Sequence, residues 1–333
     1  MTSSTPTSLL DVDQQPGKPP MLLVEPAGDA ARWVAEHKGA LRAGVAEHGS
    51  LLVRGLGLRD PAEVEAVFRQ LGSLMIEREA FAARKRYADG VYSSSKWPPN
   101  QQMCMHHELS YALEVPSLML FACLIAPKAG GATPVADSPT VLQALPADLV
   151  ERFERLGWLL VRSYGEDIGA SIADAFGTDD RDAVERYCRA NAIKFEWQEG
   201  GGLRTWQRRS AVARHPRTGE RCWFNQIAFL NEWTIDPEVR EYLVDEYGED
   251  GLPFNTRFGN GDPIDADVVQ TINGVYEANT VREPWQAGDL LLVDNLRTAH
   301  ARESFEGPRE VVVALADPVR LPGAAPANDV ARG

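Results

Sequence analysis

Apolar residues recur at helical spacing near the start of the chain and then condense into short, strand-like runs. Residues 31–48 follow a helical period and end at Gly49, a common helix stop. Residues 51–56 form an apolar run that predicts a buried strand, and a second helical pattern extends from Asp60 to Gly72. None of these segments carries recognisable chemistry, so we expect the two helices to cover one face of a sheet.

The rest of the chain mixes predicted strands and helices around a long polar stretch. Residues 78–102 are polar and irregular, and a loop of this length inside a compact domain is more often functional than idle, for example as a lid. The apolar run 117–125 predicts a central strand. Residues 130–137 are expected to form a turn into another strand. Further strands are expected at 158–161, 193–197, 221–229, 288–295 and 309–315, and helices at 139–156, 180–192, 237–247 and 265–278.

The composition is that of an ordinary soluble globular protein, with 44% hydrophobic and 25% charged residues. The 333 residues include 48 acidic and 34 basic ones, which give a formal charge of −14. This acidic balance argues against nucleic acid or an anionic membrane as a partner, because either would select a basic face. We therefore expect functional basic residues to face an anionic small molecule.

Targeting and redox signals are absent from the sequence. The first twenty residues are polar and do not form a signal peptide, and the longest apolar run, residues 118–126, is too short to span a bilayer. The four cysteines form no Cys-x-x-Cys pair, so neither a zinc knuckle nor a disulfide framework is indicated. We expect a reduced, cytoplasmic protein with disordered tails at residues 1–20 and 321–333. Nothing in the sequence indicates its oligomeric state.

The candidate chemistry begins at residues 103–111, which contain His106-x-Glu108. In an extended chain the side chains at i and i+2 share a face, so His106 and Glu108 point together while His107 points away. One imidazole and one carboxylate supply two of the three ligands of a facial metal site that leaves positions open. About one such pair is expected by chance in a chain of this composition, so the motif needs a third ligand from elsewhere.

The other five histidines are the candidates for that ligand: His37, His48, His107, His215 and His300. The first two lie on a predicted surface helix, the third faces away from His106, and the fourth lies in a turn. His300 differs in that it follows a buried strand by a few residues, close before a strand that begins with Arg309.

An arginine beside an open-sided iron site has a specific use. Such sites commonly hold a 2-oxo acid through its keto acid end, which leaves a distal carboxylate to be bound. Arg309 offers this carboxylate a charge-assisted and often bidentate contact. Thr133, which follows the turn at Gly130 and Gly131, offers a further hydrogen bond.

Four segments, in this order over most of residues 50–316, resemble the taurine/2,4-D dioxygenase family of Fe(II)- and 2-oxoglutarate-dependent oxygenases. They are residues 106–111, 130–134, 223–226 and 288–309. The resemblance is nearest to the clavaminate-synthase-like members, because the carboxylate is glutamate. It implies an α+β fold whose core is a double-stranded β-helix (jelly-roll, cupin-like) with flanking helices and an inserted helical segment. It also implies a single domain spanning residues 21–320.

The resemblance implies a site as well. Iron would be bound by His106, Glu108 and His300, and 2-oxoglutarate would be held by Arg309 with Thr133. Only nine residues separate His300 from Arg309, which is few for this family, so Arg302 stays open as an alternative. The implied reaction consumes O2 and 2-oxoglutarate, releases succinate and CO2, and hydroxylates a C–H bond.

The substrate implied by the resemblance is an amino acid or an amino-acid derivative in natural-product biosynthesis, free or attached to a peptidyl carrier protein. Desaturation, epoxidation and cyclisation use the same site, whereas halogenation is disfavoured because halogenating relatives lack the carboxylate. A sulfonate or phosphonate would need further basic residues, for which the sequence offers Arg204, Arg208 and Arg209 or, alternatively, only a solvated loop. From other classes, a non-catalytic metal-binding β-barrel and a Zn²⁺ hydrolase stay open.

Five residues are candidates for contacting the substrate, and for each the alternative is a role in packing only. The loop before the motif contributes three of them and the aromatic segment at residues 221–229 contributes two. They are Tyr92, Ser94, Trp97, Asn225 and Gln226.

Overall fold

The computed structural model describes residues 10–25, 28–79, 84–165, 169–248 and 251–322. Its largest sheet has seven strands in the order β1-β2-β16-β6-β19-β4-β3, with the β1–β2 pair parallel and the other pairs antiparallel. These strands are β1 (Met21–Leu23), β2 (Ser50–Arg54), β16 (Leu290–Asp294), β6 (Glu114–Ile125), β19 (Glu310–Arg320), β4 (Val91–Ser93) and β3 (Arg86–Ala88).

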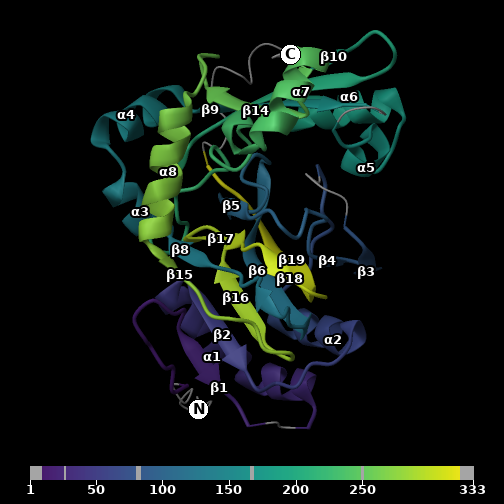
Figure 1. Ribbon diagram of the computed structural model, residues 1–333. Coiled ribbons are helices and arrows are strands. Elements are labelled where there is room, and N and C mark those ends of the chain that lie inside the picture. The colour runs from purple at the N-terminus through teal and green to yellow at the C-terminus, as the bar shows by residue number, and fades with distance from the viewer. Residues whose placement is uncertain (1–9, 26–27, 80–83, 166–168, 249–250, 323–333) are drawn as a thin grey trace, which may run out of the picture.

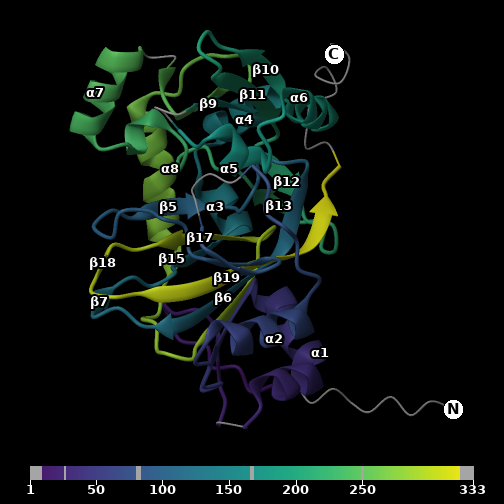
Figure 2. The same ribbon diagram turned by 90° about the vertical axis from the view of Figure 1, so that its right-hand side faces the viewer.

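The central strands of this sheet are buried on both faces, because alternate side chains enter different cores. On β6, Leu118 and Leu120 pack in the outer core, whereas Met119 and Phe121 pack in the inner one. The outer core is closed by α1 (Ala30–His48) and α2 (Pro61–Leu71), which lie beneath the sheet in Figures 1 and 2. This confirms the expectation that the first two helices cover a sheet.

A four-stranded sheet lies on the other side of the inner core, in the order β15-β8-β17-β5. Its strands are β15 (Thr280–Val281), β8 (Val135–Asp137), β17 (Thr298–Arg302) and β5 (Met103–His106), and a short pair, β7 (Ala129–Gly130) with β18 (Phe305–Glu306), lies beside it. The two sheets bring residues 103–106 and 298–302 against the inner face of β6 and β19, which is where the candidate site lies.

Most of the segment between β8 and β15 forms an inserted layer at the top of Figure 1, and many of its buried side chains pack in the inner core. It holds a second four-stranded sheet, in the order β10-β11-β9-β14, and the hairpin β12–β13. Its elements are α3 (Ser138–Ala144), α4 (Ala147–Leu156), β9 (Trp158–Tyr164), α5 (Ile172–Phe176), α6 (Arg181–Ala190), β10 (Lys194–Trp197), β11 (Leu203–Arg209), β12 (Val212–Arg214), β13 (Arg221–Trp223), η1 (Glu232–Thr234), α7 (Pro237–Tyr247), β14 (Phe254–Phe258) and α8 (Ala266–Ala278).

Four sequence predictions of local structure were wrong. The strand expected at 221–229 ends at Trp223, and residues 227–230 form a turn. The helix expected at 139–156 is broken at Leu145 (ψ 149°), because the following Pro146 disfavours a helical conformation in the residue before it. The polar stretch 78–102 is not one irregular loop, since it contains β3 and β4, which pair with each other and, through β4, with β19. Residues 203–209 form strand β11 with alternating burial rather than a solvated loop.

The predicted tails lie largely outside the described residues. Within residues 10–20, the backbone of Asp13 pairs with that of Met21 through two hydrogen bonds of 2.8 and 2.9 Å. No helix in the described ranges has the length and apolar character needed to cross a membrane.

Candidate active site

Three buried side chains converge beneath the inner face of the large sheet: His106, Glu108 and His300. The three potential ligand atoms lie within 4.8 Å of one another. Oε2 of Glu108 is 3.9 Å from Nε2 of His106 and 3.7 Å from Nε2 of His300. Two imidazoles and one carboxylate gathered on one side of a space form the donor set of the facial site that non-haem Fe(II) oxygenases use.

Strand pairing explains why the two histidines meet. His300 on β17 lies directly opposite His106 on β5 in the antiparallel register, and residues in such positions have neighbouring side chains. Their ring centroids are 4.4 Å apart. The chain leaves β5 after His106 and turns at Leu109, whose φ of +54° lies in the left-handed region. Glu108 therefore shares the face of His106, as the spacing predicts.

Asn295, in the turn between β16 and β17, holds the backbone of Glu108. Its side-chain oxygen accepts from Glu108 N–H at 2.8 Å, and its side-chain nitrogen donates to the carbonyls of Glu108 at 3.0 Å and Pro116 at 2.8 Å. The side-chain amide of Asn295 thus pairs with both the N–H and the carbonyl of Glu108, as the backbone of a neighbouring strand would. The sequence analysis recorded a polar turn here but assigned it no role.

The side chain of His107 points away from those of His106 and Glu108, as predicted. From that side it fixes residues 106–109, which we call the ligand loop. It is fully buried, its Nδ1 donates to the carbonyl of Asn295 at 2.5 Å, and its Nε2 lies 2.7 Å from Oγ of Ser138. Because a carbonyl can only accept, Nδ1 carries the proton and Nε2 accepts from the serine hydroxyl. Burial lowers the pKa of His107 to about 4, so the ring is neutral at physiological pH.

The metal-facing groups are held in the protonation states that a metal requires. Nδ1 of His106 donates to the carbonyl of Cys104 at 2.8 Å, which leaves the lone pair of Nε2 facing Glu108. Burial, reinforced by neighbouring His300, lowers the pKa of His106 to about 3. Burial alone would raise the pKa of Glu108, but the charge of Arg84, together with the neighbouring imidazoles of His300 and His106, holds this pKa below its usual range.

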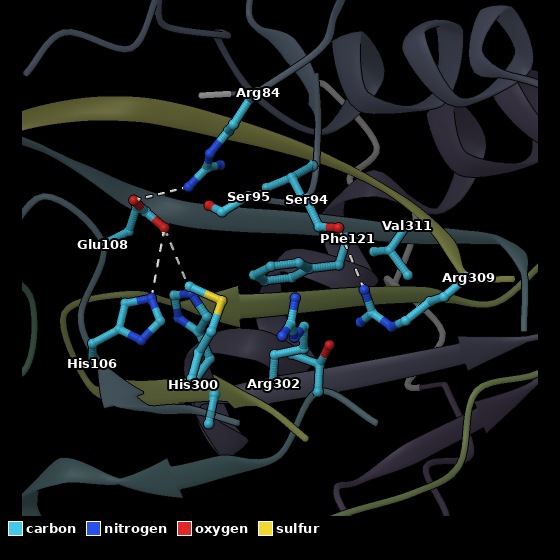
Figure 3. A pocket seen from close by; sticks show the side chains of 14 residues that line it. Arg84, Ser94, Ser95, His106, Glu108, Phe121, His300, Arg302, Arg309 and Val311 are labelled. Carbon is cyan, nitrogen blue, oxygen red and sulfur yellow. Dashed lines mark hydrogen bonds and ion pairs between the residues drawn. The ribbon is translucent and has the colours of Figure 1, made fainter. Parts of the chain in front are cut away.

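These side chains line one end of a small cavity. Figure 3 shows the triad with Arg84 on one side, Arg309 on the other and Phe121 between them. The lining is mostly apolar in the middle and charged at both ends. It consists of Arg84, Ser94, Ser95, Met103, His106, Glu108, Phe121, Thr133, His300, Ala301, Arg302, Arg309, Val311 and Val313.

Arg309 enters the far end of the cavity from the start of β19. Its Nε donates to the carbonyl of Gly131 at 2.9 Å, and its Nη1 donates to Oγ of Ser94 at 3.4 Å. Gly131 permits this approach: it has a φ of +70°, and a Cβ there would lie 2.9 Å from Cβ of Phe305 and 3.2 Å from Cδ of Arg309.

Thr133 lies on the cavity wall, where its hydroxyl accepts a hydrogen bond from Nε1 of Trp285 at 3.2 Å. Because that bond uses the hydroxyl as an acceptor, its own hydrogen is left to donate. A carboxylate in the cavity would take both this hydrogen and those of Arg309. The pair that the sequence analysis selected for 2-oxoglutarate is therefore brought to one cavity.

Arg302 also reaches this end of the cavity, but its contacts differ from those of Arg309. Its two terminal nitrogens donate to three backbone carbonyls, those of Trp97 at 3.1 Å, Pro98 at 2.7 Å and Gln101 at 2.7 Å. These bonds tie the segment 97–101 to β17. Most hydrogen-bond donors of the Arg302 guanidinium are therefore already bonded to backbone carbonyls. Arg309 is the better candidate to bind a carboxylate ligand.

The five substrate candidates divide between the cavity and its supports. Ser94 lines the cavity, whereas Trp97 packs against Phe229 with ring centroids 6.0 Å apart. Tyr92 is not among the lining residues, and its hydroxyl accepts from Glu77 N–H at 3.1 Å.

Asn225 and Gln226 support the ligand loop instead of lining the cavity. Nδ2 of Asn225 donates to the carbonyl of Ala211 at 3.0 Å, and Nε2 of Gln226 donates to that of His107 at 2.8 Å. Both side chains are buried. Their contacts correspond to the packing alternative that the sequence left open.

The basic cluster at residues 204–209 does not reach the cavity. Arg209 is buried in the inserted layer, where its Nε donates to the carbonyl of Tyr111 at 2.6 Å, and Arg208 donates to the carbonyl of Leu156. Neither they nor Arg204 are among the lining residues. The interpretation of this cluster as a solvated loop was wrong, and its proposed capture of a substrate anion loses its support.

Comparison with known proteins decides the family. Residues 19–315 match the family described as "Taurine catabolism dioxygenase TauD, TfdA family". The chain belongs to this family. The dapdiamide synthesis protein DdaC of Enterobacter agglomerans is 35% identical over 280 residues, which cover 83% of this chain and 84% of that protein. A clavaminate synthase-like protein of Arabidopsis thaliana is 31% identical over 281 residues, covering 81% and 82%.

Solved structures give the same picture at the level of the fold. The structure of a taurine dioxygenase from Burkholderia xenovorans superimposes with a TM-score of 0.52 at 16% identity, covering 94% of this chain and 96% of that one. This TauD/TfdA-family protein is an Fe(II)- and 2-oxoglutarate-dependent dioxygenase that uses O2. The residues fit that chemistry, since Nε2 of His106 is free for a metal and the hydroxyl of Thr133 has a hydrogen to donate.

Proposed function

We propose that His106, Glu108 and His300 bind the iron and that Arg309, with Thr133, binds the distal carboxylate of 2-oxoglutarate. The observation that carries this assignment is the cavity itself. It has a His-Glu-His cluster at one end and, at the other, an arginine that pairs with no carboxylate in the part of the chain that the structure describes. We also propose that the seven-stranded and four-stranded sheets form a double-stranded β-helix within one dioxygenase domain spanning residues 21–320.

The reaction is proposed to be hydroxylation of a C–H bond in an amino acid or amino-acid derivative, free or carried by a peptidyl carrier protein. Support comes from the relative DdaC, whose name assigns it to dapdiamide synthesis, a biosynthetic rather than a catabolic task. The loss of the Arg204–Arg209 cluster as an anion site also weakens the sulfonate and phosphonate alternatives.

Iron, 2-oxoglutarate and O2, when bound, supply the oxidative decarboxylation that yields succinate and CO2 and the oxidation of the substrate. The protein's own part is to bind and orient. His106 and His300 direct their Nε2 atoms toward the Glu108 carboxylate, and Arg309 would fix the far end of the cosubstrate. Phe121, Val311 and Val313 keep the wall between the two ends apolar and limit the access of water.

The test is a panel of amino acids, offered free and as carrier-protein thioesters, with Fe(II), 2-oxoglutarate and O2. Mass spectrometry should show a gain of one oxygen in one class of substrate, with matching release of succinate. The same panel with His300→Ala should give neither. Succinate formed with taurine-like sulfonates and with no amino-acid compound would overturn the substrate proposal while leaving the cofactor assignment intact.

A second outcome distinguishes the reaction types that share this site. Desaturation and cyclisation each remove two hydrogens from the substrate, whereas hydroxylation and epoxidation each add an oxygen. A product lighter by two mass units would therefore replace hydroxylation with one of the former. An oxygen gained by an alkene substrate at the double bond would indicate epoxidation.

A further inference from the structure

The two oxygens of the Glu108 carboxylate face different partners. Oε2 faces both imidazoles, at 3.9 and 3.7 Å from their Nε2 atoms. Oε1 faces away from them and accepts a hydrogen bond from Nη2 of Arg84 at 3.2 Å (Figure 3). Arg84 was not selected from the sequence, and nothing in the proposed function assigns it a role.

This division matters because a carboxylate can bind a metal through one oxygen or through both. A facial site works by leaving coordination positions for other ligands. If Glu108 bound through both oxygens, one of those positions would be lost. We propose that Arg84 is a positioning residue that occupies Oε1 of Glu108 and so restricts this carboxylate to a single metal bond.

Arg84 is itself held in place from behind. Its Nε lies 3.4 Å from Oε2 of Glu77, and the side chains of both residues are almost entirely buried, at 8% and 5% exposure. Glu77 is in turn fixed where its N–H donates to the hydroxyl of Tyr92. The guanidinium therefore lies between two carboxylates, one structural and one facing the metal position.

The three groups form one buried charge cluster, in which a single cation lies between two carboxylates. Burial opposes the charge on Arg84, but Glu77 and Glu108 together raise its pKa, so the guanidinium stays protonated. Burial raises the pKa of Glu77 to about 7, against the pull of Arg84. Removing Arg84 would leave two buried carboxylates without their shared cation, which is costly unless one of them gains a second metal bond.

The inference concerns coordination and is independent of the substrate. It rests on the family's cofactor use and on the assignment of Glu108 as a ligand, and not on the amino-acid proposal. Its test can therefore be made without substrate and without O2, so that failure of the substrate proposal leaves it untouched.

The experiment compares the full-length parent protein with Arg84→Met and Arg84→Lys under anaerobic conditions. Fe(II) is added first and its affinity measured, and 2-oxoglutarate is then titrated while the weak visible band of its iron chelate is followed. We expect Arg84→Met to keep Fe(II) within a few-fold of the parent. We also expect its affinity for 2-oxoglutarate to fall by roughly tenfold or more, with a weakened or shifted band.

Arg84→Lys should recover part of the lost affinity, because an ammonium can still donate to Oε1. Arg86→Met is the matched control: Arg86 lies on the same segment, is exposed, and pairs only locally with Asp89 among the described contacts. It should behave as the parent. If Arg84→Met does not fold, the double variant Glu77→Gln/Arg84→Met removes the stranded carboxylate and serves in its place.

Two results would overturn the proposal. One is an unchanged chelate band and unchanged 2-oxoglutarate affinity in Arg84→Met. The other is an equal loss of Fe(II) binding in the Met and Lys variants, because the segment's integrity would then matter rather than the contact with Oε1.

Discussion

The two ends of the cavity are built in opposite ways. At the metal end two of the three metal-facing residues are tied to partners of matching chemistry: His106 to the carbonyl of Cys104, and Glu108 to Arg84 and Asn295. At the other end, Arg302 and Arg309 have no carboxylate partner within the described residues, and burial lowers the pKa of each to about 10. Arg302 also contributes to the lowered pKa of Arg309.

The difference shows which end is complete before ligands arrive. The metal end is pre-organised, so its geometry depends on the protein's own bonds. The arginine end stores positive charge in a buried place, which is unfavourable until an anion binds. An anionic cosubstrate should therefore stabilise the fold through this end, since a ligand that binds only the native state shifts the unfolding equilibrium.

The largest effect should come from breaking the metal end. His300→Ala removes one of two opposed imidazoles, so we expect loss of Fe(II) affinity well beyond the roughly 10–100-fold cost of losing an outer-shell partner. Product formation should fall to background. Metal titration of the purified variant checks this, with thermal unfolding to verify the fold. Retention of parental metal affinity would remove His300 from the ligand set.

Breaking the arginine end should leave the metal end intact. Arg309→Met removes a charge-assisted hydrogen bond of about 1.5–3 kcal/mol, so the affinity for 2-oxoglutarate should fall by roughly 10–100-fold. Fe(II) affinity should stay at the parental value.

Arg302→Met is the matched variant for this prediction, because its guanidinium is used by the carbonyls of the segment 97–101. Arg302→Met should lower the affinity for 2-oxoglutarate much less than Arg309→Met does. The reverse ranking of the two variants, measured by calorimetric titration, would reassign the cosubstrate to Arg302.

A smaller effect on metal binding, combined with lost stability, is expected from Asn295→Ala. The substitution leaves Glu108 N–H and two carbonyls unpaired in a buried place, and each such group costs about 1–3 kcal/mol. Urea unfolding of the metal-free protein should show the loss. Fe(II) affinity should fall less than in His300→Ala, and a larger fall would make Asn295 as important as a ligand.

A last expected effect leaves both ends of the cavity in place and concerns only the pH dependence of stability. The pKa of His107 falls from 6.5 to about 4 on folding because of burial, so between these values the unfolded chain binds a proton that the native protein does not. Stability from this group is complete above pH 6.5 and is lost as pH falls toward 4, on the order of 3 kcal/mol. His107→Gln should flatten the slope in urea unfolding curves of the metal-free protein, and parallel curves would contradict this.

The sequence predicted those features that depend on residues close together in the chain. The i, i+2 relation of His106 and Glu108, the opposite direction of His107 and the helix at residues 237–247 follow from short-range periodicity. The resemblance to a family then supplied His300, Arg309 and Thr133, which the structure gathers around one cavity. The break at Pro146 was visible in the sequence and was overlooked.

Other features had no local signal. Asn295 acts on Glu108, which is 187 positions away in sequence, and Arg84 lies in a polar stretch with no periodicity. Strand β11 contains arginines whose alternate burial depends on pairing with β9 and β10, so its polar sequence indicated a loop. These interactions are set by tertiary packing, which overrides local propensity.

Alternate side chains along β19 face the cavity and the outer core, so substitutions that change the cavity need not change the outer core. Val311 and Val313 line the cavity, whereas Val312 and Ala314 pack against the outer helices. Substitutions at the first pair can reshape the chamber while the scaffold's other layer stays unchanged. A laboratory library confined to these two positions and Phe121 would vary the cavity wall while leaving the outer core and its two helices unchanged, and the same separation gives natural selection a route to new products.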